Sequence, residues 1–389
     1  MALSAKHESP RRTVGIVAGE ASGDLLGGEL ILALRELMPQ LDFVGIGGAR
    51  MESAGMEAWF PLEKLAVRGY VEVAKHYFGI VGIRRRLCRR FIAHPPDVFI
   101  GIDAPDFNLD LERKLKSHGI PTVHYVSPAI WMWRKERLRK IKRAVSKMLT
   151  LFPFEEPLYR QAGIDATCVG HPLADILDQV PRRAAAREQL RLPLAAPVIA
   201  LLPGSRQSEL QHMADLFIQT AKAISRRMPQ ALFLVPLTTR ETRQMFETAI
   251  YRNNAEDLQL TVLFGHAHDA MSAADAVLVA SGTATLEAAL LAKPMVITYK
   301  MPAASYWLLK GKGYLPYYGL PNILAGEFVV PEIIQDDATP QNLAQALLNL
   351  LGDESVRARV ERKFSAIGAS LSRGAARQAA LAILPLLQT

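Results

Sequence analysis

The feature that most constrains the fold is a repeated alternation of short apolar runs with helix-like segments. In the first half of the chain the apolar runs occupy 13–18, 43–47, 98–102 and 121–126. After a charged stretch at about 182–191 the alternation restarts, with apolar runs at 197–202, 232–236, 258–264, 276–280 and 294–299. Continuous apolar strands separated by helices are typical of a parallel sheet covered on both faces. The sequence therefore predicts an α/β protein with two successive doubly wound units.

The length of the chain agrees with two units. It has 389 residues, of which 50% are hydrophobic, and this is more than one ordinary core accommodates. We predict an N-terminal domain over 1–172 and a C-terminal domain over 173–364, with the helices from about 365–389 packing back on the first domain. Ligands bind at the carboxyl ends of the strands in such sheets, so a cleft between the domains is the expected active site.

The charge of the chain favours anionic partners. The net charge is +8 and the sequence pI is about 9.4, which suits nucleic acid, anionic lipid or phosphorylated substrates. No apolar run reaches the roughly 18 residues that a membrane span needs, and the first residues lack the apolar region of a secretory signal. We therefore expect a cytoplasmic protein whose contact with a membrane is peripheral.

A glycine-rich turn follows the first predicted strand. It contains Gly19, Glu20, Ser22, Gly23 and Asp24. The glycines permit a tight turn, Ser22 or Asp24 could cap the next helix, and the start of that helix would face an anion or a sugar. The segment is neither a P-loop nor a GxGxxG motif, and a plain capped turn is the simpler alternative.

Two further polar segments follow predicted strands in the first half. Asp103 comes directly after 98–102, where a carboxylate in a cleft suits a general base, and Asp106 is expected to cap the next helix. Taken alone, the pair is better explained as caps or turn formers. Ser127 and Trp131 follow the strand at 121–126, where they could line an acceptor groove or serve ordinary packing.

The second half carries three segments of the same kind. After 197–202, the backbone of Ser205 and the forked cation of Arg206 suit a diphosphate. The small residues Ser281, Gly282 and Thr283 open a helix whose start is ready for an anion, and Glu287 lies one turn further on, where it could accept hydrogen bonds from ribose. The amide of Asn322, expected in a loop, could orient phosphate or sugar. The simpler alternatives for these three segments are a surface arginine on a turn, an ordinary capped helix and a plain turn.

One surface segment combines apolar and basic residues. The stretch 70–90 contains Val71, Val73, Tyr77, Arg84, Arg85 and Arg86, and a second basic helix is expected over 134–147. Such a mixture suits an anionic lipid interface, although a helix with a buried face and a solvated basic face is the commoner explanation. His266 and His268 have the spacing of metal ligands but no evident third ligand, so we expect no metal site.

Together these segments resemble one family, lipid-A-disaccharide synthase. The resemblance rests on AGEASGDLLG at 18–27, GIDAPDFN at 101–108, HYVSP at 124–128 with Trp131 and Trp133, GHP at 170–172, LPGSR at 202–206, the segment 280–287 and LPN at 320–322. It runs over nearly the whole chain, and it favours a functional role for Asp103 over a capping role.

The resemblance implies the GT-B architecture, in which two Rossmann-like domains face each other across a cleft. It implies an inverting transfer from UDP-2,3-diacylglucosamine to 2,3-diacylglucosamine 1-phosphate, which gives the β-1,6-linked precursor of lipid A and UDP without a metal or other cofactor. Asp103 is then the expected base, with Arg206, the helix start at 281–283 and Asn322 stabilising the leaving UDP. An anionic inner-membrane surface is the expected partner, and a homodimer is a candidate state.

Two other functions stay open from the sequence. One is another GT-B enzyme, such as a UDP-sugar 2-epimerase, which needs no lipid acceptor. The other is a basic nucleic-acid-binding protein, but no nucleic-acid motif is present and the cations lie beside apolar residues, so we expect no nucleic-acid partner.

Overall fold

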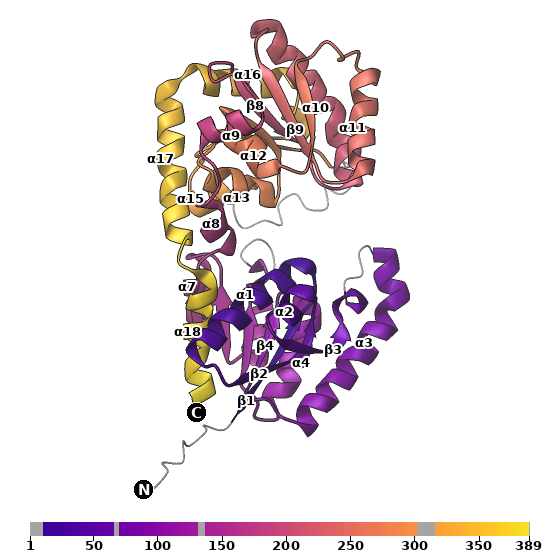
Figure 1. The fold of residues 1–389 in the computed structure, drawn as a ribbon, viewed down its shortest axis with the longest axis vertical. Helices are drawn as coiled ribbons and strands as arrows, with labels where there is room; N and C mark the ends of the chain where they lie inside the picture. Colours follow the sequence, from indigo (N-terminus) through magenta and orange to yellow (C-terminus); the bar gives the residue numbers. More distant parts are fainter. Residues whose placement is uncertain (1–10, 66–69, 131–136, 302–315, 389) are drawn as a thin grey trace, which may run out of the picture. The chain divides into compact units, whose positions relative to one another are not determined.

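The structure is a computed structural model that describes residues 11–65, 70–130, 137–301 and 316–388, with only the backbone described for 70–78. The chain divides into two compact units, one formed by 1–172 together with 371–389 and the other by 173–370. Each unit contains one parallel sheet with helices on its faces (Figure 1).

The first unit has a seven-stranded parallel sheet with the order β3-β2-β1-β4-β5-β6-β7. The strands are β1 (Arg12–Ala18), β2 (Leu41–Gly47), β3 (Met56–Pro61), β4 (Val98–Ile102), β5 (Thr122–Tyr125), β6 (Lys147–Thr150) and β7 (Ala166–Cys168). Successive strands are added outward from β1 on one side and then from β4 on the other. The carboxyl ends of β1 and β4 are therefore the topological switch point, where doubly wound sheets bind ligands.

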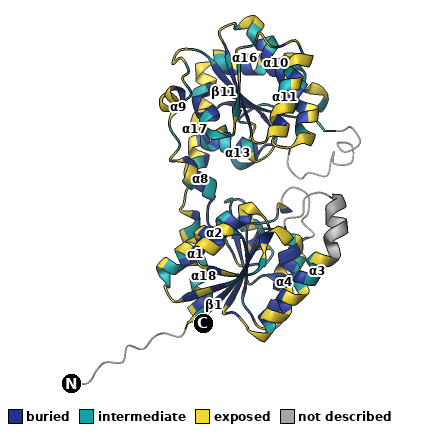
Figure 2. Ribbon diagram, turned by 45° about the vertical axis from the view of Figure 1, so that its right-hand side comes forward, coloured by how far each residue is buried: buried dark blue, intermediate teal, exposed yellow. Residues whose placement is uncertain are grey.

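Helices cover both faces of this sheet. They are α1 (Ala21–Leu37), α2 (Ala49–Ser53), α3 (Tyr70–Ala93), α4 (Pro105–Lys116), α6 (Arg137–Ala144), α7 (Glu155–Gln161) and α18 (Ala375–Gln388), with a 3-10 turn at Leu62–Lys64. Val14 and Ile16 pack on α1 and α18, whereas the next residue along, Val17, packs on the opposite face with α3 and α4. The strands are accordingly buried and the outer helix faces exposed (Figure 2).

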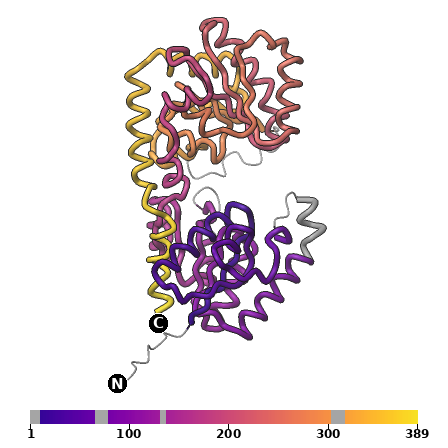
Figure 3. The backbone as a smooth tube through the Cα atoms, viewed as in Figure 1, coloured from indigo at the N-terminus to yellow at the C-terminus, as the bar shows by residue number. Residues whose placement is uncertain are grey.

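The C-terminal helix belongs to the first unit although the second unit separates it in sequence. The chain returns and places α18 beside α1 (Figure 3), where Ala379, Ile383 and Leu387 are fully buried. At the return, the backbone N–H of His171 donates to the carbonyl of Leu371 at 2.9 Å. Gly170 has a φ of +89°, and a Cβ there would lie 2.5 Å from the same carbonyl, so only glycine fits this close approach.

The second unit repeats the plan with six parallel strands in the order β10-β9-β8-β11-β12-β13. The strands are β8 (Val198–Leu202), β9 (Leu232–Leu237), β10 (Leu260–Phe264), β11 (Ala276–Ala280), β12 (Met295–Tyr299) and β13 (Glu332–Ile334). Its switch point lies at the carboxyl ends of β8 and β11.

The helices of the second unit bury most of their apolar residues against this sheet. They are α8 (Pro172–Leu177), α9 (Arg183–Gln189), α10 (Gln207–Arg227), α11 (Arg240–Arg252), α12 (Ala267–Ala273), α13 (Thr283–Leu290), α15 (Leu320–Ala325), α16 (Pro340–Gly352) and α17 (Glu354–Leu371). The largest hydrophobic cluster joins β8, β9 and β11 to α10 and α16, with Phe217, Phe233 and Phe246 at or near zero exposure.

The structure corrects two sequence expectations and adds three strands. The basic helix expected over 134–147 ends at Ala144, because Lys147 begins β6. Asn322 lies on helix α15 and not in a loop. The short strands β3, β6 and β13 were not predicted at all. No helix among the described residues is long and apolar enough to cross a membrane.

Candidate functional site

The first two polar segments of the sequence meet at the switch point of the first unit. Strands β1 and β4 pair in parallel with Ala18 opposite Ile102, so Gly19 and Asp103 leave the sheet side by side. A Cβ on Gly19 would lie only 2.4 Å from the Cβ of Ala104. Gly19 is therefore needed because the turn after β4 packs directly on the turn after β1.

Asp103 has an unusual backbone conformation. Its φ is +51° and that of Ala104 is +43°, so two consecutive non-glycine residues lie in the left-handed region. The N–H of Asp103 donates to the carbonyl of Tyr125 at 2.8 Å, and its carbonyl accepts from Nδ2 of Asn108 at 2.9 Å. The side chain is partly exposed, and among the described residues none donates a hydrogen bond to its carboxylate. Left-handed non-glycine residues persist only where the surroundings fix them, and they concentrate at functional sites.

The glycine-rich turn differs from the expected capping arrangement. Helix α1 begins at Ala21, and the exposed Glu20 is its N-cap without a side-chain hydrogen bond. Asp24 is 7% exposed and accepts backbone hydrogen bonds from Gly48, Arg50 and Met51 at 2.8–3.1 Å. The prediction that Ser22 or Asp24 caps α1 is therefore wrong, because Asp24 caps α2 instead. The side chains of Glu20 and Ser22 are exposed, whereas Gly23 is buried.

Two neighbouring predictions also change. The N-cap of α4 is Ala104, so Asp106 does not cap the helix; its exposed carboxylate pairs with Arg137 at 3.2 Å. The hydroxyl of Ser127 lies 2.8 Å from that of Tyr159, a fully buried residue whose pKa is raised by burial. Trp131 and Trp133 lie outside the described residues.

The second unit brings the LPGSR segment and the segment after β11 to its own switch point. Strands β8 and β11 pair with Leu202 opposite Val279. Arg206 is the N-cap of α10 and its side chain is 79% exposed. The carboxylate of Glu209 accepts hydrogen bonds from the N–H groups of Ser205 at 2.9 Å and Arg206 at 3.2 Å, and from the guanidinium of Arg206 at 3.2 Å. The donors predicted to hold a diphosphate thus hold a carboxylate of the chain itself.

Glu209 was not predicted as a site residue, although its position in the sequence carries a signal. A glutamate three residues after an N-cap is the spacing of a capping box, and the glutamate half of that box forms here, because the carboxylate of Glu209 accepts from the N–H of the N-cap residue Arg206. Gly204, with a φ of +121°, leaves the room that the glutamate occupies, because a Cβ there would lie 2.6 Å from Oε2 of Glu209.

The helix start after β11 is open to solvent. The N–H of Ser281 is committed to the carbonyl of Thr298 at 3.0 Å, while Gly282, with a φ of +149°, and Thr283 are exposed. Glu287, one turn into α13, lies 3.6 Å from Nε2 of His268. The neighbouring carboxylate of Glu287 raises the pKa of His268.

The two histidines weighed as metal ligands both have carboxylate partners. His266 pairs with Asp269 at 2.8 Å and His268 pairs with Glu287. Within the described part of the chain, no group of three or more histidine, cysteine, aspartate or glutamate side chains has the arrangement of a metal site.

Asn322 is fully buried and its amide is saturated. Its Nδ2 donates to the carbonyl of Val330 at 2.9 Å and to Glu332 at 2.8 Å, and its Oδ1 accepts from the N–H groups of Val329 and Val330. Glu332 also accepts from the backbone N–H groups of Tyr318 and Gly319. In this conformation Asn322 fixes the segment around α15, and it has no hydrogen-bonding capacity left for a ligand.

The basic helix α3 buries one face over the part whose side chains are described, residues 79–93. Ile83, Leu87 and Phe91 are buried, which agrees with the commoner of the two explanations weighed for it. Arg84 binds Asp110 at 3.0 Å and the carbonyl of Asp106 at 3.1 Å, so it ties α3 to α4 and is not free for a lipid headgroup.

Of the remaining residues of the predicted lipid-contact segment, two have described side chains and three do not. Arg85 and Arg86 are exposed, with the guanidinium of Arg86 5.4 Å from the ring centre of Phe60. The side chains of Val71, Val73 and Tyr77 lie outside the described ones.

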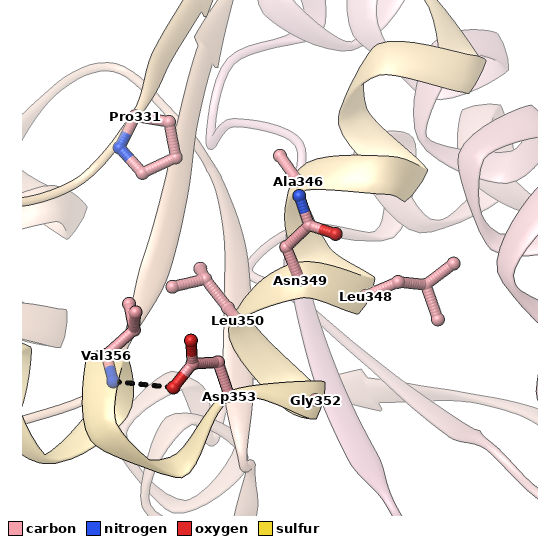
Figure 4. Close-up of a pocket in the computed structure, with 8 residues that line it drawn as sticks. All are labelled: Pro331, Ala346, Leu348, Asn349, Leu350, Gly352, Asp353 and Val356. Carbon is pink, nitrogen blue, oxygen red and sulfur yellow. Dashed lines mark hydrogen bonds between the residues drawn. The ribbon is translucent and has the colours of Figure 1, made fainter.

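A pocket in the second unit lies away from these motifs. It is lined by Pro331, Ala346, Leu348, Asn349, Leu350, Gly352, Asp353 and Val356 (Figure 4). Pro331 precedes β13, so the pocket is at the amino ends of the strands, opposite the switch point. Asp353 is used there to cap α17, since it accepts from the N–H of Val356 at 3.1 Å.

Comparison with solved structures supports the fold. The chain is similar to a putative UDP-N-acetylglucosamine 2-epimerase from Listeria monocytogenes, with a TM-score of 0.66 and 13% identity over 97% of this chain and 96% of that one. It is also similar to HepE from Anabaena in complex with UDP and glucose, with a TM-score of 0.57 and 15% identity over 97% and 100% of the two chains. These neighbours and the two Rossmann-like sheets confirm the predicted GT-B fold class.

Comparison of sequences is more specific. Residues 14–383 match the family model described as lipid-A-disaccharide synthetase. A lipid-A-disaccharide synthase of Methylobacillus flagellatus is 57% identical over 97% of this chain and 100% of its own length, and one of Chromobacterium violaceum is 55% identical over 95% and 96%. The predicted resemblance is confirmed, and the epimerase and nucleic-acid alternatives are not favoured. The chain therefore belongs to the lipid-A-disaccharide synthase family of glycosyltransferases.

Proposed function

We propose that this chain transfers a 2,3-diacylglucosaminyl group from its UDP derivative to the 6-hydroxyl of 2,3-diacylglucosamine 1-phosphate. The products are the β-1,6-linked disaccharide 1-phosphate and UDP. The observation that carries the proposal is the constrained left-handed backbone of Asp103 at the switch point of the first unit, with a partly exposed carboxylate. The left-handed backbone is strained, and the surrounding contacts hold it so that one acidic side chain lies where doubly wound sheets bind ligands.

In the proposed reaction, Asp103 accepts the proton of the acceptor hydroxyl as its oxygen attacks the anomeric carbon of the donor. The bond between that carbon and the phosphate oxygen breaks, and its electron pair leaves with UDP. One displacement inverts an α-linked donor to a β-linked product. General bases of this kind contribute about 10²–10⁴ in rate.

The second unit is proposed to bind UDP and to stabilise the charge that develops on it. Arg206 is exposed and supplies a forked cation, and the exposed start of α13 at Gly282 and Thr283 offers the positive end of a helix. Glu287 would accept hydrogen bonds from ribose. The carboxylate of Glu209 occupies the N–H groups of Ser205 and Arg206. The diphosphate of the UDP-sugar can therefore bind these groups only if the Glu209 carboxylate moves aside.

Asn322 is proposed to act on UDP indirectly. Its four hydrogen bonds fix the segment from Gly319 to Glu332, so its contribution would be to shape the neighbouring surface and not to contact the phosphate. In the first unit, the exposed Glu20 and Ser22, beside Gly19 and Gly23, and the hydroxyl of Ser127 are proposed to contact the acceptor.

Peripheral association with the anionic inner membrane is part of the proposal. Arg85 and Arg86 are exposed on α3, and each cation near an anionic surface contributes about 1 kcal/mol. The single variants Arg85→Ser and Arg86→Ser should each bind vesicles of anionic lipid more weakly than Arg84→Ser, because Arg84 is already paired with Asp110. Binding of both single variants equal to that of Arg84→Ser would remove this surface from the proposal.

Product analysis tests the reaction itself. Purified protein is incubated with UDP-2,3-diacylglucosamine and 2,3-diacylglucosamine 1-phosphate, and the products are identified by mass spectrometry and by the anomeric coupling in NMR. We expect a β-1,6 disaccharide 1-phosphate and one UDP per disaccharide. UDP release without disaccharide, or conversion of UDP-N-acetylglucosamine alone to its 2-epimer, would contradict the proposal.

A further inference from the structure

Helix α4 carries polar side chains on the face that packs against the sheet. Asn108 and Glu112, one turn apart, are both fully buried, and Glu112 lies 2.7 Å from Nδ1 of the equally buried His124 on β5. Buried polar groups cost free energy unless they make hydrogen bonds, so their presence under the first switch point calls for a physical reason.

The amide of Asn108 is directed at the backbone of the strand end. Its Nδ2 lies 2.9 Å from the carbonyl of Asp103 and 3.3 Å from that of Ile102. The N–H of Asp103 is held from the other side by the carbonyl of Tyr125 at 2.8 Å. Both peptide groups of Asp103 are therefore tied, one to α4 and one to β5.

The sheet is built to let this contact form. Gly101 is one of the residues of β4 beneath α4, and a Cβ there would lie 2.2 Å from Oε1 of Glu112 and 2.9 Å from the Cβ of Asn108. Glycine at this position lets the helix approach the strand closely enough for the Asn108 amide to reach the carbonyl of Asp103. The pairing of Glu112 with His124 fixes the same turn of the helix.

We infer that Asn108 is a positioning residue for Asp103, which holds the left-handed backbone that aims the Asp103 carboxylate. The direction of a side chain from the backbone depends on φ, and relaxation of Asp103 from +51° to an ordinary negative value would turn its carboxylate away from its present direction. This inference rests on the proposed function, because it assigns Asn108 a role only through the chemistry of Asp103.

The test compares steady-state kinetics of three variants with wild type. Asn108→Ala removes the donor, and we expect kcat to fall by about 10- to 100-fold, the usual effect of misplacing a catalytic group by about 1 Å, with KM for both substrates within about twofold. Asn108→Ser keeps a smaller donor, and its kcat should lie between those of wild type and Asn108→Ala. It also serves as the milder variant if Asn108→Ala does not fold.

A matched control separates positioning from loss of a buried hydrogen bond. Thr122→Val removes the bond from the fully buried Thr122 hydroxyl to the carbonyl of Ala144, at 2.7 Å, in the same sheet but at the amino end of β5. Its kcat should stay within about twofold of wild type while its thermal stability falls.

A second-site change provides a measurement of kcat that should not respond if Asn108 has only a structural role. Ala104→Gly in the Asn108→Ala background relieves the Cβ penalty at the neighbouring left-handed position and should recover part of kcat. The inference would be overturned by a folded Asn108 variant with wild-type kcat. It would also be overturned if Thr122→Val lowered kcat as much as Asn108→Ala does, or if Ala104→Gly restored none of the lost kcat. If wild type itself makes no disaccharide, the proposed function fails instead.

Discussion

Arg187 should contribute far more to the stability of the second unit than its neighbour Arg183, although both bind the same carboxylate. Arg187 on α9 is fully buried, and its guanidinium lies 2.8 Å from Asp275. Its other nitrogens donate to the carbonyls of Ala273, Pro193, Leu194 and Ala196 at 2.7–3.1 Å. The side chain of Arg183 is 46% exposed and also lies 2.8 Å from Asp275.

The expected magnitudes follow from this difference in burial. Arg187→Ala leaves a cavity and deprives four carbonyls of a donor, and removing one partner of a buried ion pair costs about 3–5 kcal/mol. Arg183→Ala removes a solvent-screened pair that contributes about 0–1 kcal/mol. The free energy of unfolding of the second unit should therefore fall by about 2–5 kcal/mol more in Arg187→Ala than in Arg183→Ala.

Native-state hydrogen exchange read by mass spectrometry is the appropriate assay, because a chain with two units need not unfold in one step. Peptides that cover β8 and β11 report on the second unit, and peptides that cover β1 and β4 serve as the internal reference. Protection of the first unit should be the same in both variants. Equal loss of protection for the two variants, or a loss in Arg187→Ala below about 1 kcal/mol, would refute the reasoning from burial.

Three further predictions concern the second unit. Arg206→Ala should raise the Kd for UDP by about 10- to 100-fold in calorimetry, the range of a charge-assisted hydrogen bond, whereas the exposed Arg240→Ala at the start of α11 should leave it unchanged. Glu209→Gln should lower the Kd for UDP, because a neutral amide competes less well than a carboxylate for the N–H groups of Ser205 and Arg206; an unchanged or higher Kd would show that these groups are reserved for the helix cap. Burial lowers the pKa of Lys293 to about 8 from 10.5, so between these values the unfolded chain binds more protons and stability should rise with pH by up to about 3 kcal/mol. That rise should be absent from Lys293→Met in unfolding experiments across this pH range.

Much of the fold could be predicted from the sequence because its central strands are continuous apolar runs. β1, β4, β8 and β11 are buried on both faces, and each run is bounded by turn residues. The strands that were missed lack this pattern. β13 has only three residues and begins with Glu332, and β6 begins with Lys147 after a basic helix. Short strands of this kind, β13 at a sheet edge and β6 between β5 and β7, are defined by pairing with a neighbour, which a local pattern does not reveal.

The sequence predicted where the residues of the candidate site lie, but it predicted few of their hydrogen-bond partners. Polar residues directly after strands 1 and 4 of each sheet come together because the strand order reverses there. Asp24 and Asn322 were expected to face a ligand, but their hydrogen-bond partners, the start of α2 and Glu332, are distant in sequence. Asn108 was overlooked because its role depends on which backbone groups lie within reach in the folded chain, whereas Glu209 was overlooked although its spacing from the N-cap is visible in the sequence.

The most direct test of the account is the turnover number of Asp103→Asn beside that of Asp106→Asn. Both changes neutralise a carboxylate in the same segment, but Asp106 is 84% exposed and paired with Arg137, whereas Asp103 occupies the constrained strand end. We predict that kcat falls by about 10²–10⁴ in Asp103→Asn, with unchanged affinity for UDP, and by less than about threefold in Asp106→Asn. An Asp103→Asn protein that forms the disaccharide at nearly the wild-type rate would contradict the account.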